Sequence, residues 1–175
     1  MGAWEDGEFI GCVLFSRGAN KNLGSRWGLT TVDVCELTRV ALSYHNASVS
    51  KIVTIAIKML KKAQHIKLIY SYADPEEEHV GTIYQAMNWF YLGMTPGSYK
   101  YKDKNGREWH QRQVSVSGYK PQYGQLRKVP KIADCEKLPQ LGKHRYLYPL
   151  DRAMRRQIEP LAQPYPKRER LEVAT

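Results

Sequence analysis

The spacing of apolar and polar positions predicts strands at the start of the chain. Residues 2–4 and 8–15 flank Glu5-Asp6-Gly7, and Asp-Gly is a favoured pair for a tight hairpin turn. A loop rich in Gly, Asn and basic residues follows at 16–26. Residues 32–42 then alternate as a further strand, which places two sets of side chains on opposite faces: Val34, Glu36, Thr38 and Val40 on one, and Cys35, Leu37, Arg39 and Ala41 on the other.

The middle of the chain predicts helices and strands in alternation. Ser48 and Ser50 are N-cap candidates for a helix over 49–63, whose apolar positions follow helical spacing: Ile52, Ile55, Ala56, Met59, Leu60 and Ala63. A short strand at 67–72 and a second helix at 81–90, ending before Gly93, come next. Residues 99–102 and 109–116 predict a hairpin around Asn105-Gly106, and a last helical piece lies near 150–161.

This order predicts an α/β fold with a mixed sheet, in which strands 32–42 and 67–72 run parallel and are joined through the helix at 49–63. The distribution of charged residues divides the chain of 175 residues into two parts. Residues 1–119 hold 14 basic and 11 acidic side chains, whereas residues 120–175 hold 13 and 6, within a total of +10. We therefore expect a core at 1–119 and a basic, Pro-rich C-terminal extension at 120–175, packed on the core, on DNA or on both. The excess favours a nucleic-acid partner over a membrane, the alternative being an ordinary basic surface.

Other features restrict the class of protein. No uninterrupted apolar run approaches 18 residues, so no membrane span is expected, and the first residues do not resemble a signal peptide. The three cysteines show no C-x-x-C spacing, which favours a reducing, cytoplasmic setting over a disulfide framework or a zinc ribbon. Both a monomer and a dimer remain open.

Two segments are candidates for chemistry. Residues 44–50 form a strand-to-helix junction, where free N–H groups suit a phosphate; a Ser-capped helix without a ligand is the alternative, since the segment has no Gly. Ser71-Tyr72-Ala73-Asp74 ends a predicted strand, at the edge where open α/β sheets bind ligands. Asp74 could relay a proton there, and Ser71 or Tyr72 could bind a substrate. The alternative is an Asp-Pro turn.

Aromatic side chains supply further candidates. In the predicted helix, Tyr84, Asn88 and Tyr91 would share one face beside Gln85 and Trp89, an arrangement suited to a nucleobase; an ordinary core helix is the alternative. Residues 143–148 and 164–168 interleave bases with aromatics, which suits phosphate contact and stacking, or else a solvated tail. The five histidines show no metal-ligand spacing, so a metal site stays unknown.

Four sequence blocks resemble the Mom family of phage DNA-modification proteins, over residues 4–168. The blocks are Glu-Leu-Thr-Arg-Val-Ala at 36–41, Ser-Tyr-Ala-Asp-Pro at 71–75, Gly-Thr-Ile-Tyr-Gln-Ala-Met-Asn-Trp at 81–89 and Lys-His-Arg-Tyr at 143–146. That family is similar to the GNAT acyltransferases. It is implicated in converting the N6 amine of adenine in double-stranded phage DNA to a carbamoylmethyl-type derivative, which resists host restriction enzymes.

The resemblance implies a GNAT-like mixed sheet with flanking helices, here lacking the first strand and first two helices. It implies an acyl donor, either acetyl-CoA or an aminoacyl-tRNA; a glycyl group holds both carbons and the nitrogen of a carbamoylmethyl group. In place of the Gly-x-Gly or Gly-x-Ala pyrophosphate loop of GNAT enzymes this chain has residues 46–50. The family's His-Tyr element, linked with iron, has no counterpart in this sequence, so no iron site is carried over.

With the function that the resemblance implies, individual residues can be given expected roles. Asp74, Ser71 and Tyr72 are expected to be catalytic. The adenine base would contact Tyr84, Gln85, Asn88 and Trp89, and the donor would contact Arg39, Asn46, Ser48 and Ser50. The expected DNA contacts are Arg17, Lys21, Arg26, Arg107, Arg112, Lys143, Arg145, Lys167 and Arg168. Two other functions stay open: an N-acetyltransferase acting on a small molecule or protein, and a non-catalytic DNA-binding relic of the fold.

Overall fold

The computed structural model describes residues 1–18, 20–63, 65–122 and 124–167. The chain forms two compact units, which are described separately. The main unit comprises Met1–Met94 and Lys143–Thr175, and the inserted unit comprises Thr95–Gly142. The boundary predicted between residues 119 and 120 falls inside the inserted unit. None of the described helices is long and apolar enough to cross a membrane.

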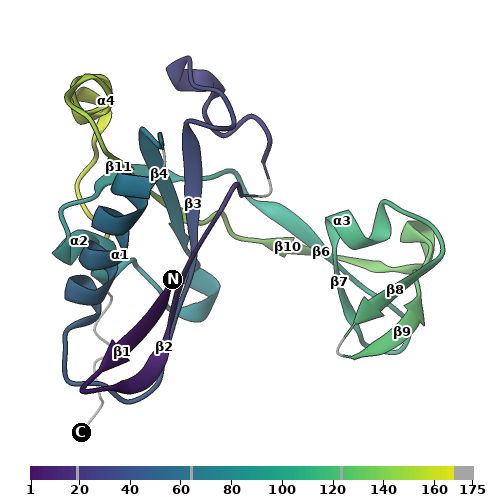
Figure 1. Ribbon diagram of the computed structural model, residues 1–175. Helices are drawn as coiled ribbons and strands as arrows, with labels where there is room; N and C mark the ends of the chain where they lie inside the picture. The colour runs from purple at the N-terminus through teal and green to yellow at the C-terminus, as the bar shows by residue number, and fades with distance from the viewer. Residues whose placement is uncertain (19, 64, 123, 168–175) are drawn as a thin grey trace, which may run out of the picture. The chain divides into compact units, whose positions relative to one another are not determined.

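The main unit is built on a six-stranded mixed sheet in the order β1-β2-β3-β4-β11-β5, which confirms the mixed α/β class (Figure 1). Its strands are β1 (Gly2–Glu5), β2 (Glu8–Ser16), β3 (Val34–Leu42), β4 (Leu68–Ala73), β5 (Phe90–Met94) and β11 (His144–Pro149). β3 and β4 are parallel and are connected through α1 (Val49–Ala63), as predicted. All other pairings in this sheet are antiparallel.

Local sequence signals determine the hairpin and the first helix. Asp6 and Gly7 have φ angles of 52° and 85°, the left-handed pair that a tight turn between right-twisted strands requires. The Ser48 hydroxyl accepts the Lys51 N–H at 3.4 Å, at the position of an N-cap for α1. The predicted bounds of both elements are confirmed to within a residue.

Two cores cover the two faces of the main sheet. On one face α1 packs through Val53, Ala56, Ile57 and Leu60. On the other, α4 (Arg152–Ile158) packs through Met154 and Ile158, together with the loop that carries η1 (Ser25–Trp27). Three of the predicted apolar positions of α1 are not in the core: Ala63 is exposed, and Ile55 and Met59 are 50% and 56% exposed. Ile55 and Met59 line a pocket of about 420 Å³ against β1 instead.

The second predicted helix is mostly wrong. α2 covers only Thr82–Ala86, because Asn88 adopts a left-handed φ of 55° and the chain then enters β5. Gly93, predicted to follow the helix, lies within this strand. Pairing of β5 with β11 outweighs the helical spacing of the aromatic side chains, so Tyr84, Asn88 and Tyr91 do not share a helix face.

A strand that the sequence analysis did not predict completes the sheet. β11 lies between β4 and β5 and is antiparallel to both, so part of the predicted C-terminal extension belongs to the centre of the main sheet. Tyr146 and Leu147 on this strand are fully buried. The predicted helical piece is confirmed as α4 followed by η4 (Glu159–Leu161).

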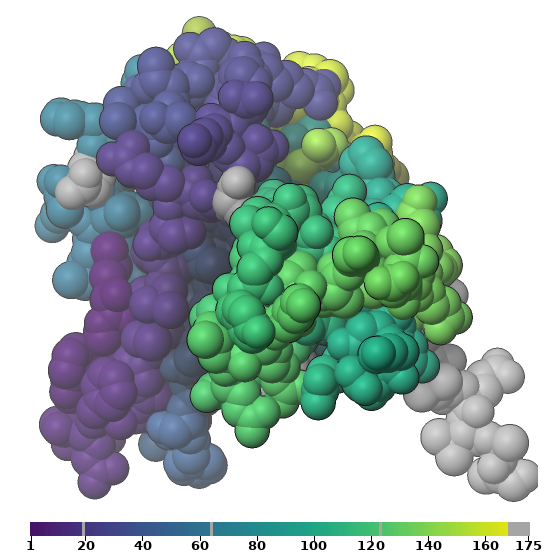
Figure 2. Space-filling model, turned by 90° about the vertical axis from the view of Figure 1, so that its right-hand side faces the viewer, coloured from purple at the N-terminus to yellow at the C-terminus, as the bar shows by residue number. Residues whose placement is uncertain are grey.

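The inserted unit has its own small core. A three-stranded sheet joins β10 (Glu136–Gln140), β6 (Ser98–Lys102) and β7 (Glu108–His110), and a separate ribbon pairs β8 (Tyr119–Gln122) with β9 (Gln125–Lys128). The predicted hairpin around Asn105-Gly106 is confirmed, but its second strand ends at His110, where a capping box begins α3 (Gln111–Val114). The buried residues are Tyr101, Trp109, Val114 and Val129. The surface of this unit is teal to green in Figure 2.

Candidate functional site

The parallel strands β3 and β4 pair only over their first halves. Val34, Cys35 and Glu36 lie opposite Leu68, Ile69 and Tyr70, and no pairing continues beyond them in the described residues. A β-bulge bends β3 at this point, because Leu14 of β2 faces Arg39 while its neighbour Phe15 faces Leu37. Thr38 is the extra residue. The bulge shifts the alternation, so Val40 packs with the α1-side core, and its predicted face is wrong.

Ser71 marks the point at which the two strands diverge. Its side chain is fully buried, and its hydroxyl donates to the Leu37 carbonyl oxygen at 2.8 Å. The hydroxyl also lies 2.7 Å from that of Tyr84, so α2 is tied to both strands. A side-chain hydroxyl thus satisfies a β3 carbonyl where ladder pairing stops, because a buried carbonyl without a partner would be costly.

The space between the diverging strand ends is a pocket of about 520 Å³, which we call the splay pocket. It is lined by Thr38, Arg39 and Val40 of β3, by Tyr72 and Ala73 of β4, and by residues 78–84. Burial, reinforced by the Glu36 carboxylate, raises the pKa of Tyr72 to about 12. The Tyr72 hydroxyl is therefore protonated at neutral pH and can donate a hydrogen bond.

Successive residues of β4 point to opposite faces of the sheet, which separates two of the predicted catalytic residues. Ile69 and Ala73 pack in the α1-side core, and Ser71, between them, bonds to Tyr84 of that core. Tyr72 packs against the opposite core. Ser71 does not line the splay pocket, whereas Tyr72 does. Of these two residues, only Tyr72 lines the pocket, and Ser71 supports it through hydrogen bonds on the opposite face of the sheet.

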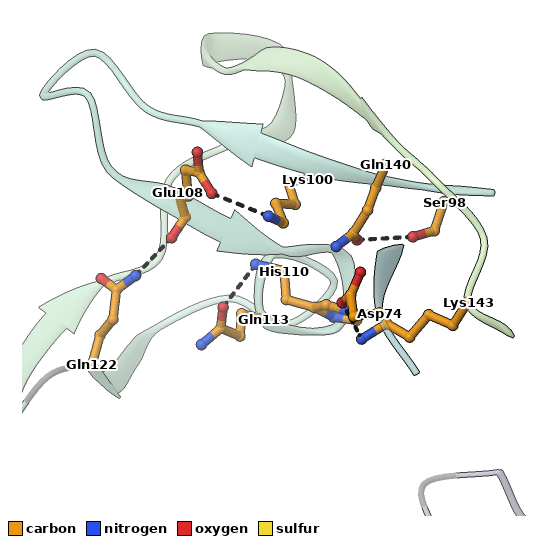
Figure 3. Close-up of polar contacts among 9 residues, drawn as sticks. All are labelled: Asp74, Ser98, Lys100, Glu108, His110, Gln113, Gln122, Gln140 and Lys143. Atoms are coloured by element: carbon orange, nitrogen blue, oxygen red, sulfur yellow. Dashed lines mark hydrogen bonds and ion pairs between the residues drawn. The ribbon is translucent and has the colours of Figure 1, made fainter. Parts of the chain in front are cut away.

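Asp74 follows β4 directly, and its carboxylate pairs with Lys143 (Figure 3). Its Oδ1 accepts the Glu76 N–H at 3.1 Å and caps η2 (Pro75–Glu77), while its Oδ2 lies 2.7 Å from the Nζ of Lys143. The alternative of an Asp-Pro turn is thus confirmed as a structural role. The carboxylate keeps 21% of its side-chain area exposed, and the preceding residue, Ala73, lines the splay pocket.

The four predicted base contacts do not form one surface. Tyr84 lines the splay pocket, and burial raises its pKa. The Gln85 amide nitrogen lies 3.0–3.1 Å from three oxygens, the Val80 carbonyl, the Tyr146 hydroxyl and the Pro166 carbonyl. Trp89 is fully buried in the α1-side core, and Asn88 is exposed at its left-handed turn. Gln85 and Trp89 therefore hold the fold together around Tyr84.

The predicted donor site at the start of α1 is occupied by another part of the chain. The Glu5 carboxylate accepts the N–H groups of Asn46 and Ala47 at 2.7 and 2.8 Å. These two hydrogen bonds lower the pKa of Glu5. A donor phosphate would have to displace this carboxylate to use the same groups. Of the four predicted donor contacts, only Arg39 lines the splay pocket.

The predicted DNA contacts are dispersed over both units, and several have internal partners. Arg17 donates to the Thr31 carbonyl, the guanidinium of Arg26 lies 5.2 Å from the ring centre of Trp27, and the half-buried Arg145 donates to the Leu92 carbonyl. Lys143 pairs with Asp74. The remaining predictions are Lys21 and Lys167, exposed in the main unit, Arg107 and Arg112, exposed in the inserted unit, and Arg168, outside the described residues.

Sequence reasoning missed several residues of this region. Gly81 lines the splay pocket with a φ of 78°, and a Cβ there would lie 2.4 Å from the Tyr146 ring. The Gly-Thr pair before an aromatic helix was a readable signal for it. Glu5 and the bulge at Thr38 had no local signal. Among the described residues, no group of three or more His, Cys, Asp or Glu side chains could hold a metal ion.

Fold and site together define a mixed α/β protein with a pocket at the splayed carboxyl ends of two parallel strands, the edge at which α/β sheets bind ligands. The model of the Mom protein family matches residues 1–167, and the chain belongs to this family. Membership indicates phage DNA modification, and a protein of this kind acts on DNA. A comparison with curated proteins gave no match.

Proposed function

We propose that this protein is a GNAT-like transferase that modifies the N6 amine of adenine in double-stranded DNA with a carbamoylmethyl-type group, which protects phage DNA from host restriction. Family membership over residues 1–167 carries the proposal, and the splay pocket supplies a place for the chemistry. The adenine must leave the base stack to reach such a pocket, as bases do in other base-modifying enzymes.

Proton removal is the difficult step, because the exocyclic amine of adenine is a weak nucleophile. In the proposed reaction N6 attacks the acyl carbon of the donor, an N–C bond forms, and the bond from that carbon to its leaving group breaks. Asp74 accepts the N6 proton. Asp74 follows Ala73, which lines the splay pocket, and a carboxylate with exposed area next to the pocket is suited to this role.

The lining of the pocket supports the other roles. Tyr72 and Tyr84 both line the pocket, where they would donate hydrogen bonds to the base or stack on it. Arg39 is exposed at the pocket and would hold an anionic part of the donor. Ser71 acts through its neighbours, because its two hydrogen bonds determine where β3 and Tyr84 lie.

The contacts of Glu5 favour one of the two proposed donors over the other. Acetyl-CoA carries a pyrophosphate, which would meet the Glu5 carboxylate at the Asn46 and Ala47 N–H groups, so this part of the chain does not fit it as it stands. We therefore favour an aminoacyl-tRNA as donor. A glycyl group is an isomer of the carbamoylmethyl group, which would form from it by rearrangement. The described residues do not fit an iron site, and no step is assigned to iron.

The test is nucleoside mass spectrometry of plasmid DNA from cells that express the protein. We expect a new adenosine species with the wild type, none with Asp74→Asn, and unchanged modification with Asp6→Asn, a matched change in the exposed β1–β2 turn. Asp74→Asn should still bind DNA. Normal modification by this variant would remove Asp74 from the chemistry, and unmodified adenine with the wild type would contradict the proposed function.

A further inference from the structure

The positive charge of this protein is concentrated in the inserted unit. Its 48 residues hold ten Lys and Arg against four Asp and Glu, a net charge of +6, whereas the other 127 residues carry +4 in total. A unit this small with that excess attracts polyanions. Half of these basic residues precede the extension predicted at 120–175: Lys100, Lys102, Lys104, Arg107 and Arg112.

Two of the four acidic side chains are engaged inside the unit. The Asp103 carboxylate accepts the N–H groups of Asn105 and Arg107 and the indole N–H of Trp109, so it holds the β6–β7 turn. Glu108 lies 3.5 Å from the Nζ of Lys100 (Figure 3). Both carboxylates therefore stabilise the fold of the inserted unit through these contacts.

The basic residues gather around a cleft of about 840 Å³, formed by the β6–β7 turn, the end of β9 and the segment that follows it. Five cationic side chains line this basic cleft, against the carboxylates of Asp103 and Asp134: Lys104, Arg107, Arg127, Lys128 and Lys131. All five belong to the inserted unit, and all but Arg127 are exposed.

Arg127 gives the cleft a specific feature. Its terminal nitrogen donates to Gln125 at 2.8 Å, but its Nε is buried and has no hydrogen-bond partner among the described residues. A buried N–H of a charged group without an acceptor is costly. Arg127 also lines the cleft, where an anionic oxygen would pair with its guanidinium. Guanidinium with neighbouring ammonium groups is the combination that contacts phosphates in nucleic-acid complexes.

The adjacent ribbon favours a duplex as the ligand. β8 and β9 form an isolated two-stranded ribbon, and a two-stranded ribbon is an element that fits the major groove of B-DNA. Tyr119 and Leu126 on this ribbon are 64% and 70% exposed. Apolar side chains held out in this way can contact thymine methyl groups, while the basic cleft holds the backbone.

We propose that the basic cleft binds the phosphate backbone of duplex DNA, and that the inserted unit is the module that docks this protein on its substrate. The choice of duplex DNA rests on the proposed function; the assignment of the cleft as a phosphate-binding site rests on its charge and on Arg127.

The test measures binding of a short fluorescent duplex by anisotropy across a salt series. The cleft variant Lys104→Gln/Lys128→Gln/Lys131→Gln is compared with Lys58→Gln/Lys61→Gln/Lys62→Gln, which removes the same charge from exposed lysines of α1. The slope of log K against log salt is negative, and each lost phosphate contact reduces its magnitude by about 0.9. We therefore expect the slope of the cleft variant to be smaller in magnitude by about 2 to 3, and the control to keep the wild-type slope. Arg127→Gln alone should lower affinity, and a normal unfolding transition shows that each variant is folded.

Equal losses in both triple variants would overturn the inference, because net charge alone would then explain binding. Tighter binding of tRNA than of duplex through the same lysines would overturn duplex DNA as the ligand. Failure of the proposed function is a separate result: cleft-dependent binding with unmodified adenine contradicts the chemistry and leaves the cleft, whereas normal modification and normal binding by the cleft variant contradict the cleft alone.

Discussion

The splay pocket and the basic cleft differ in how their polar groups are satisfied. Around the pocket, Ser71 bonds to two partners and Asp74 pairs with Lys143. In the cleft five cations face two carboxylates, and the Nε of Arg127 has no described partner. Reacting groups must be held in place before the substrate arrives, whereas affinity for a polyanion needs positive charge that the protein itself does not neutralise.

The largest expected effect comes from removing the core of the inserted unit. Trp109 is 1% exposed and donates its indole N–H to Asp103. Trp109→Ala costs about 3–5 kcal/mol, which a core of four buried residues cannot tolerate. We expect hydrogen exchange to show lost protection in β6 and β7 with protection retained in β4 and β11, together with lost DNA affinity.

The control for this change is Trp4→Ala, which removes a 62% exposed indole and should leave both units protected. Loss of protection in β4 with Trp109→Ala would show that the two units unfold together, and the separation of the pocket from the cleft would then not hold.

A smaller change should affect the pocket alone. Gly81 has a φ of 78°, and an added Cβ would lie 2.4 Å from the Tyr146 ring; Gly7 has a φ of 85° with nothing near its Cβ position. Gly81→Ala and Gly7→Ala therefore share the conformational penalty, and only the first adds a clash. We expect Gly81→Ala to be destabilised by about 1–3 kcal/mol more than Gly7→Ala in urea unfolding.

Gly81→Ala should also modify less adenine than the wild type, because the displaced segment lines the splay pocket. Its DNA binding should keep the wild-type salt slope. A change in that slope would connect the pocket to DNA affinity and weaken the comparison.

Local sequence patterns predicted the elements whose signals are local. The Asp6-Gly7 turn and the periodicity of α1 lie within short windows, and both elements have the predicted bounds to within a residue. α2 and β5 could not be separated in this way. Their boundary at Asn88 depends on pairing with β11, which lies more than 50 residues further along the chain. β11 itself was missed because its central position in the sheet is decided by its neighbours.

The residues of the site also divide into those that a local pattern predicts and those that depend on distant contacts. Placing Asp74 and Tyr72 at the end of a strand followed from sequence, and the structure has them there. The roles of Gln85 and Trp89 in packing, the bulge at Thr38 and the bonds from Glu5 to a loop 41 residues away depend on tertiary contacts that no local pattern records. The cleft also combines residues from the β6–β7 turn with residues that follow β9.

The smallest expected effect separates the main unit from the basic cleft by pH. Asp33 accepts the hydroxyl and N–H of Thr30 and lies 3.0 Å from the Nζ of Lys67, and these contacts lower its pKa from 3.8 to about 2. A carboxyl whose pKa is lowered in the folded state stabilises the protein at pH values above its unfolded-state pKa. This contribution disappears as the pH falls to the folded-state pKa.

The thermal midpoint of the wild type should therefore exceed that of Asp33→Asn at about pH 5, and the difference should shrink between about pH 4 and pH 2. Asp33 does not line the basic cleft, so Asp33→Asn should bind the duplex as the wild type does at neutral pH. A midpoint difference that stays constant down to pH 2 would show that the contacts of Asp33 act without its charge.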